Sequence, residues 1–141
     1  MAKNPMGCEK LFDLQYAPST FTAYAKETIS GGEFVFCSGA TAKVTSGIDS
    51  YTTSDIEVAT GASGTNVIGM ALHNATSGNP VTIMTRGVVI ASCGANIDAS
   101  QPATIDGSHA VQPATAYGEV VGRTLTAGAS GGYLILGLSI I

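Results

Sequence analysis

The feature that most constrains the fold of this chain is a phrase of strand, polar turn and strand that occurs twice. The first copy is "IGMALHNATSGNPVTIMTRG" at residues 68–87, and the second is "VGRTLTAGASGGYLILGLSI" at residues 121–140. The aligned groups are Ile68-Gly69 with Val121-Gly122, Leu72 with Leu125, Ser77-Gly78 with Ser130-Gly131, and Val81-Thr82-Ile83 with Leu134-Ile135-Leu136. Glycine in each turn supplies the positive φ that a tight hairpin requires. The repetition therefore predicts a recurrent β-hairpin unit.

A shorter version of the phrase lies ahead of both copies. In "ISGGEFVF", residues 29–36, Ser30-Gly31 precedes the apolar run Phe34-Val35-Phe36. Every β protein accumulates Ser-Gly turns, because tight turns favour these residues. Taken alone, this partial copy favours a third repeat and a chance match equally.

Short strands account for the rest of the chain from Ile29 onward. Apolar or alternating runs are bounded there by Gly, Ser, Asn and Pro, and this pattern is typical of strands and hairpins. Charged residues make up only 11% of the chain, whereas the exposed faces of long helices need them. The predicted strands are 33–37, 40–44, 67–73, 80–85, 88–92, 103–105, 110–112, 118–126 and 133–140. The predicted fold class is all-β, a small β-barrel or β-sandwich of short antiparallel strands with an extended N-terminal arm.

The N-terminal arm is predicted over residues 1–22, ahead of a single β domain over 23–141. The arm has no clear period, and apolar anchors are spaced among its polar residues. An extended segment with such anchors is costly to leave in water, so it should dock on its own body, a neighbouring subunit or a larger partner. The anchors, which are the candidate contact residues, are Leu11, Phe12, Leu14, Tyr16 and Phe21.

Two further segments complete the predicted organisation. Residues 45–66 are long and polar, with one possible strand at Ile56–Ala59, and are predicted to form a surface excursion from the domain. Residues 23–28, "AYAKET", are predicted to form one helical turn.

Charge and hydropathy exclude two classes of partner. The net charge is -4 and Lys and Arg together number six, too few for the phosphate contacts of a nucleic-acid-binding protein. No window approaches the eighteen or more continuous apolar residues of a membrane span, and the N-terminus lacks the apolar core of a signal peptide. The chain is therefore expected to bind neither nucleic acid nor membrane, and to be made in a cytoplasm or assembled there.

One catalytic motif matches the sequence in residue pattern but not in its expected structural context. Gly128, Ser130 and Gly132 satisfy G-x-S-x-G, the pattern of a nucleophile elbow. That elbow needs a strand that turns into a helix, and here the following residues predict a strand. We therefore interpret Ser130 as a turn residue.

The other polar residues do not predict a catalytic site. Asp106, Ser108 and His109 are nearly adjacent, and adjacent side chains point in different directions, so an Asp-Gly turn flanked by solvated residues is favoured over a triad. His73 is predicted to be a partly exposed turn residue. The chain is accordingly predicted not to be an enzyme.

Cofactor and metal sites are not predicted either. Asp49, Asp55 and Glu57 form the main acidic cluster but lack EF-hand spacing, so a solvated loop is favoured. The cysteines, at positions 8, 37 and 93, show no metal-ligand spacing; Cys37 and Cys93 adjoin apolar runs as core residues do, and Cys8 is the candidate for reactivity.

Three phrases in this order resemble those of a known family. They are "GGEFVFCSGATAKV", "VIGMALHNATSGNPVTIMTRGVV" and "GEVVGRTLTAGASGGYLILGL". They resemble the tailed-phage capsid decoration proteins, also called cement or head-stabilising proteins, over most of residues 29–141. The residues that take the family's positions are Ile68-Gly69-Met70-Ala71-Leu72, Ala75, Gly78, Val81, Ile83 and Gly87-Val88, whereas Glu33 stands where the family has Asp.

The resemblance implies a small β-barrel or β-sandwich on the outside of a bacteriophage head, commonly as a homotrimer. It implies a structural virion protein that binds the major capsid protein and stabilises the capsid's outer surface. The apolar arm is compatible with a segment that clamps neighbouring capsomers. The last strand, "YLILGLSII", has apolar residues on both faces, so both faces should be covered, either by the core alone or by the core and a sister subunit. The alternatives are a phage fibre, spike or baseplate β domain and, less favoured, a carbohydrate-binding or hydrolase module.

Overall fold

The computed structural model describes residues 19–38 and 56–140 of the chain. In this part it has nine strands and two short 3-10 helices. The elements are β1 (Ser19–Ala25), β2 (Phe34–Cys37), β3 (Glu57–Ala59), η2 (Gly64–Asn66), β4 (Gly69–Ala71), β5 (Pro80–Ser92), β6 (Pro102–Ile105), β7 (Val111–Pro113), η3 (Tyr117–Glu119), β8 (Gly122–Thr124) and β9 (Tyr133–Ser139). The predicted all-β class is confirmed. The strand predicted at 40–44 lies outside the described residues.

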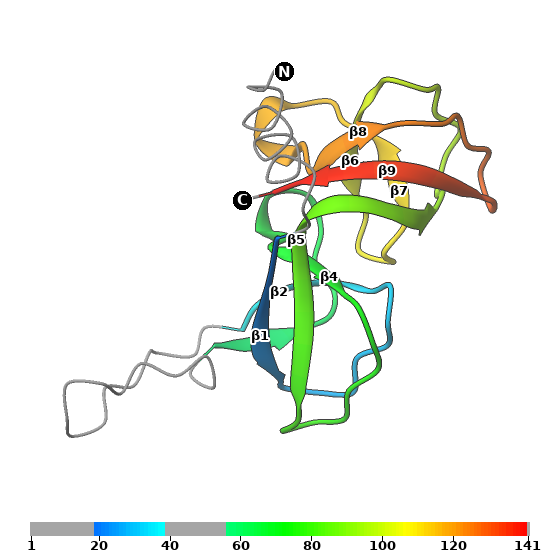
Figure 1. Cartoon of the computed structure of the whole chain (residues 1–141). Helices are drawn as coiled ribbons and strands as arrows, with labels where there is room; N and C mark the ends of the chain where they lie inside the picture. The colour runs from blue at the N-terminus through cyan, green and yellow to red at the C-terminus, as the bar shows by residue number, and fades with distance from the viewer. Residues whose placement is uncertain (1–18, 39–55, 141) are drawn as a thin grey trace, which may run out of the picture.

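The strands form two small rings that share β5 (Figure 1). In the first ring, β1, β3, β2, β4 and the first half of β5 follow one another, and pairing of β1 with β5 closes it. In the second, the other half of β5 continues to β9, β8, β6 and β7. A parallel bridge between Cys93 and Val111 then returns β7 to the end of β5. We call these rings the N-terminal barrel and the C-terminal barrel.

The two barrels have the same connectivity. In the N-terminal barrel the first strand pairs in parallel with the third and antiparallel with the fifth, and the remaining neighbours are antiparallel. The C-terminal barrel repeats this order, with the second half of β5 as its first strand and β9 as its fifth. The predicted hairpins are confirmed as β4–β5 and β8–β9. They are the second halves of a larger duplicated unit.

Individual hydrogen bonds recur between the barrels, which fixes the residue equivalences. The hairpin turn is tied to the first strand in the same way in both copies, and the outer edge of the hairpin is bonded in the same way. The matching bonds are Gly78 N to Ala25 O (2.7 Å) with Gly131 N to Cys93 O (2.9 Å), and Leu72 N to Thr82 O (3.0 Å) with Leu125 N to Ile135 O (2.8 Å). Gly78 and Gly131 both have φ of 85°.

The partial third copy is a different turn. Its positive φ belongs to Gly32, at 93°, and Glu33 N donates to Ser30 O across 3.1 Å. This turn leads into β2, and the residue equivalent to Gly32 in the other barrel is Ser100, whose φ is 64°. Gly32 N and Ser100 N donate to equivalent carbonyls, those of Ala71 and Thr124. The phrase "ISGGEFVF" is therefore not a third hairpin.

Three predictions of local secondary structure are wrong. The strand predicted at 118–126 does not begin at Gly118, because Tyr117–Glu119 form η3 and β8 covers only Gly122–Thr124. Residues 80–85 and 88–92 are not separate strands, because β5 runs through Gly87, which takes a φ of 151° where the strand passes from one barrel to the other. Glycine permits that bend without ending the strand. Residues 23–28 do not form a helical turn, because Ala23 and Ala25 belong to β1 and are buried against β5. Tertiary pairing there overrides the helix propensity of alanine.

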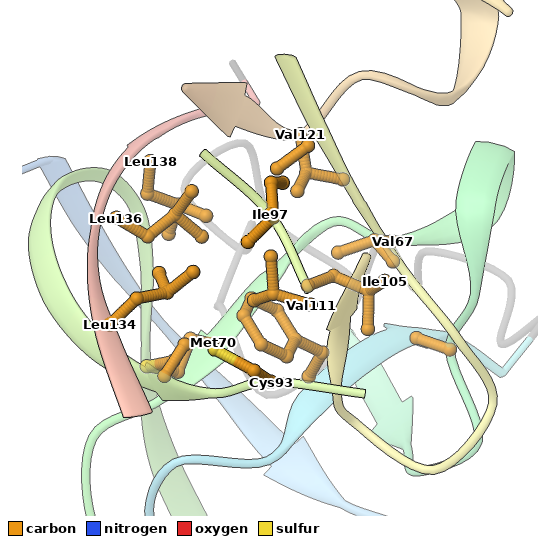
Figure 2. Packing of buried hydrophobic residues seen from close by; sticks show 14 residues of the cluster. Val67, Met70, Cys93, Ile97, Ile105, Val111, Val121, Leu134, Leu136 and Leu138 are labelled. Carbon is orange, nitrogen blue, oxygen red and sulfur yellow. The ribbon is translucent and has the colours of Figure 1, made fainter. Parts of the chain in front are cut away.

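Each barrel has its own apolar cluster. The N-terminal cluster consists of Ala23, Ala25, Ile29, Val35, Val58, Ala71, Ala75, Val81 and Ile83. The larger C-terminal cluster, shown in Figure 2, consists of Phe34, Ala62, Val67, Met70, Ala91, Cys93, Ile97, Ala103, Ile105, Val111, Val121, Leu134, Leu136 and Leu138. As predicted, the apolar runs that follow the hairpin turns supply core residues in both barrels. The possible strand at Ile56–Ala59 is confirmed as β3.

The barrels are joined by side chains that leave one and enter the core of the other. Phe34 on β2 and Met70 on β4 are register partners in the N-terminal barrel, yet both belong to the C-terminal cluster. Their equivalents in the other barrel are Pro102 and Arg123, which are also register partners but are not fully buried. The outward-facing pair thus consists of two large apolar residues where the other barrel covers it, and it includes a charged residue where none does.

One pair of contacting residues differs in side-chain size between the two barrels, and this difference gives a testable prediction. Gly128 lies so close to Cys93 that an added Cβ would overlap the Cys93 sulfur and lie 3.1 Å from Cβ of Leu134. The equivalent positions in the N-terminal barrel hold two alanines, Ala25 and Ala75. Gly128→Ala alone should destabilise the fold by about 1–3 kcal/mol through overpacking. Cys93→Ala in the same chain should recover most of that loss, because the pair then matches the N-terminal barrel.

Urea unfolding of the two single variants and the double variant measures this coupling. Additive losses would show that the two sites do not share a packing constraint. Leu134→Val, which installs the residue equivalent to Val81, should improve the double variant further because it removes the Leu134 Cδ2 atom, which lies 3.1 Å from the added methyl group.

Candidate interaction surface

Most of the predicted contact residues lie outside the described part of the chain. Leu11, Phe12, Leu14 and Tyr16 precede Ser19 and are not described. Phe21 lies within β1, opposite Ile83 of β5, and packs half-buried against the N-terminal cluster. Phe21 therefore has a structural role in the barrel, and the strand begins within the span predicted for the arm.

Ser130 lies in a turn, as predicted. The residues after it form strand β9 instead of a helix, and its hydroxyl donates to Gly94 O across 3.3 Å. In the N-terminal barrel Ser77 donates in the same way to Lys26 O across 2.8 Å. The serine of "GASGG" thus ties the hairpin turn to the end of the first strand in both units.

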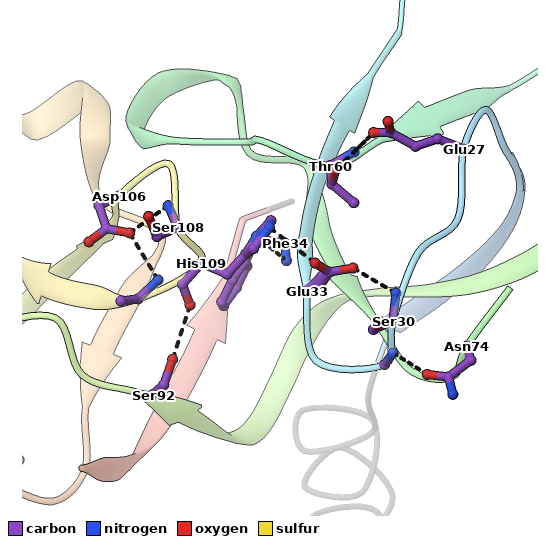
Figure 3. Close-up of polar contacts among 12 residues, drawn as sticks. Glu27, Ser30, Glu33, Phe34, Thr60, Asn74, Ser92, Asp106, Ser108 and His109 are labelled. Carbon is purple, nitrogen blue, oxygen red and sulfur yellow. Dashed lines mark hydrogen bonds and ion pairs between the residues drawn. The ribbon is translucent and has the colours of Figure 1, made fainter. Parts of the chain in front are cut away.

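The turn that contains Asp106 also contributes a contact between the two barrels, which the sequence did not predict. Asp106 Oδ1 accepts from Ser108 N (2.8 Å) and Ala110 N (3.1 Å), which confirms the turn (Figure 3). His109, however, is half-buried: its Nδ1 accepts from Phe34 N across 3.2 Å and its Nε2 lies 3.3 Å from Glu33 Oε2. His109 therefore links the C-terminal barrel to β2 of the N-terminal barrel, beside the buried Phe34.

Other polar residues support local structure. His73 is exposed in the turn after β4, as predicted, and its Nε2 accepts from Thr82 N across 3.1 Å. Glu27 accepts from Thr60 N (2.9 Å) and from the Thr60 hydroxyl (2.8 Å), and these bonds lower the pKa of its carboxyl. Glu57 accepts from the Ser38 hydroxyl across 2.8 Å. The other two members of the acidic cluster, Asp49 and Asp55, lie outside the described residues.

The two described cysteines have opposite environments. Cys93 is buried as predicted, and its burial raises the pKa of the thiol. The prediction for Cys37 is wrong, because it is exposed at the end of β2. Within residues 19–38 and 56–140, no three His, Cys, Asp or Glu side chains are grouped so as to hold a metal ion. The same part of the chain has no helix long and apolar enough to cross a membrane.

A continuous apolar face covers the outside of the C-terminal barrel. It consists of Val88 (65% exposed) and Ile90 (70%) on β5, Tyr133 (74%) and Ile135 (38%) on β9, and Leu125 (53%) just after β8. Ile90 lies opposite Ile135 in the β5–β9 register, and Leu125 donates its N–H to Ile135 O across 2.8 Å. We call these five residues the β5–β9 face. An exposed apolar surface of this kind, on the order of several hundred Å2, marks an interaction site in soluble proteins.

The equivalent face of the N-terminal barrel is polar at three of the five positions, and Leu72 and Pro80 stand where the β5–β9 face has Leu125 and Tyr133. Thr22 and Thr82 are register partners there, as Ile90 and Ile135 are in the C-terminal barrel. Thr20 takes the position of Val88. The barrel therefore forms with β-branched polar residues at all three positions, and its fold does not require the isoleucines and the valine of the β5–β9 face.

Sequence reasoning identified part of this face. The apolar residues on both sides of "YLILGLSII" predicted that β9 needs cover on its outer side. The contribution of β5 was missed, because residues 80–85 and 88–92 were predicted as two separate strands. Alignment of residues 19–25 with 87–93 carries the missing signal, since it sets threonines against Val88 and Ile90.

Comparison with known proteins bears on the fold. No protein-family model matches the chain, and no curated protein sequence matches it. Among solved structures, the chain is similar to the N base of the head fiber gp8.5 of bacteriophage phi29, with a TM-score of 0.60 and 18% sequence identity. The similarity covers 87% of this chain and 95% of that one. The two proteins therefore share a fold over nearly their whole lengths.

Proposed function

We propose that this protein is a structural component of a phage virion that decorates and stabilises the outer surface of the capsid. In this role it binds the major capsid protein, assembles as a homotrimer and has no enzymatic activity. It needs no cofactor, and it contacts neither nucleic acid nor membrane.

The observation that carries the proposal is the shared fold. The structure it matches is the base of a fiber on a phage head, and the match includes nearly all of both chains. The three phrases that resemble capsid decoration proteins supply independent support, because they were identified from sequence and fall on β2, on the β4–β5 hairpin and on the β8–β9 hairpin. Both lines favour a protein attached to a phage head.

The arm is the proposed attachment to the capsid. Residues 1–18 carry the anchors Leu11, Phe12, Leu14 and Tyr16 and continue directly into Ser19, the first residue of β1. β1 is bonded to both β5 and β3, so it is an integral strand of the N-terminal barrel. A load on the arm would therefore be carried by a strand with partners on both sides.

Removal of residues 1–18 tests this attachment. The deletion leaves β1 whole, whereas a cut after Phe21 would remove part of that strand and unfold the barrel. The full chain should co-sediment with expanded phage heads, and the shortened chain should bind at least about tenfold more weakly, because several apolar contacts are lost. A full-length control with Leu72→Thr, an exposed apolar residue on the barrel, should bind as the native chain does. Undiminished binding of the shortened chain would contradict the role of the arm.

The base of a head fiber is the second candidate function, because the similar solved structure is the base of such a fiber. The two candidates differ in copy number. A decoration protein should be present in hundreds of copies per particle, and a fibre component in tens. Gel densitometry of the particles recovered in the co-sedimentation experiment, with the major capsid protein as internal standard, distinguishes them.

A further inference from the structure

The β5–β9 face differs from its counterpart in the same chain by a change of polarity at matched positions. The β5–β9 face has Val88, Ile90 and Ile135 where the N-terminal barrel has Thr20, Thr22 and Thr82. All six residues are β-branched, so their strand-forming tendencies are alike. The difference between the two sets is the exchange of a hydroxyl for a methyl or ethyl group. Strand formation therefore does not account for the apolar set, and a covering surface does.

The joint between the barrels provides an internal precedent. Phe34 and Met70 also face outward from their own barrel, and their equivalents Pro102 and Arg123 are not fully buried. Phe34 has no exposed surface and Met70 only 4%, because the C-terminal cluster covers them. The outward positions of Phe34 and Met70 are thus contacts with another unit of the same chain.

We propose that the β5–β9 face is the surface through which copies of this chain associate. The inference gives a location to the homotrimer of the proposed function and rests on that proposal for the number of copies. The arm is assigned there to the capsid, which leaves this face for a sister subunit.

Charge supports a second copy as the partner. The chain has a net charge of -4, so two copies repel each other overall. Strands β5, β8 and β9 contain no acidic residue, and their two charged residues are Arg86 and Arg123. Contact through this face therefore brings acidic chains together without placing carboxylates against each other.

The exposed area also favours this assignment. Five large side chains expose between 38% and 74% of their surface. Side chains of this size and exposure present on the order of several hundred Å2, which is a large part of the roughly 800 Å2 that one partner contributes to a standard stable interface.

The test replaces the face with residues that the fold already uses. The triple variant Val88→Thr, Ile90→Thr and Ile135→Thr installs the residues of the N-terminal barrel at the equivalent positions. The native full chain should give a mass that is a multiple of 14.2 kDa, three times that value for the trimer, in sedimentation equilibrium or light scattering. The variant should associate at least about a hundredfold more weakly, because three buried apolar side chains are lost from each copy. Leu72→Thr, on the N-terminal barrel, is the matched control and should retain the native mass.

Circular dichroism of the variant confirms that it folds, and a fully folded variant with the native mass overturns the proposal. So does a native chain that stays at 14.2 kDa up to high micromolar concentration. A chain without residues 1–18 should keep the native oligomeric mass. If it associates when the full chain does not, the arm covers the face and the proposal is wrong. Head binding is scored separately, so a native oligomer that fails to bind heads contradicts the proposed function alone.

Discussion

Replacement of Phe34 by alanine is expected to lower the free energy of unfolding by about 3–5 kcal/mol, which is the usual cost of removing a buried aromatic side chain. Phe34 has no exposed surface and packs in the C-terminal cluster although β2 belongs to the N-terminal barrel. The variant loses contacts on both sides of the joint. Because small domains are stable by only about 5–15 kcal/mol, this single change should remove a large fraction of the total.

The matched control is Pro102→Ala, at the equivalent position of the C-terminal barrel. Pro102 is partly exposed, so its replacement should change stability by less than about 1 kcal/mol. Urea unfolding followed by far-UV circular dichroism measures both variants. A loss for Phe34→Ala no larger than that for Pro102→Ala would show that the two barrels are not held together through this side chain.

A methyl group at Gly122 should be as damaging, for a different reason. A Cβ there would overlap the carbonyl oxygen of Gly137 and lie 3.2 Å from the Cα of Leu138, so the backbone of β9 would have to move. Gly69, its equivalent, approaches β5 in the same way, with a Cβ position 2.6 Å from Met84 O. Gly122→Ala and Gly69→Ala should each cost about 3 kcal/mol or more, because the clash is with main chain that cannot rotate away.

Gly107→Ala is the control for this pair. Gly107 has no atom within 4 Å of its Cβ position, so alanine fits without contact and should be nearly neutral. Thermal unfolding of the three variants gives the comparison. Tolerance of alanine at both Gly69 and Gly122 would mean that the strand pairs β4–β5 and β8–β9 are farther apart than the structure has them.

The sequence predicted those features that depend on neighbouring residues. Alternation of apolar and polar residues identified strands, and Ser-Gly turns identified the two hairpins with their register. The repeated Ile68-Gly69 and Val121-Gly122 pairs also marked the two close approaches between strands, although their role became clear only from the distances. The false motif around Ser130 was rejected correctly, since the residues that follow it favour a strand.

Errors arose where distant segments decide the outcome. "AYAKET" has residues that suit a helix, and pairing with β5, more than fifty residues away in the chain, makes its first three residues the end of strand β1. Cys37 adjoins an apolar run and is nevertheless exposed. The half-buried His109 is a polar turn residue by sequence, and only the approach of β2 gives it Glu33 and Phe34 as partners.

The sequence by itself determined that this protein is built of short strands and repeats a hairpin, because those properties follow from side-chain alternation and from the φ that glycine allows. Only the tertiary structure decided that the chain contains two equivalent barrels sharing β5. The pairings that close each ring join segments far apart in sequence, and no local pattern encodes them. Once the barrels are superposed in register, the polarity of each outer face can be compared within one molecule. That comparison identifies the β5–β9 face, which is apolar where its counterpart carries threonines, as the surface that we propose binds a partner.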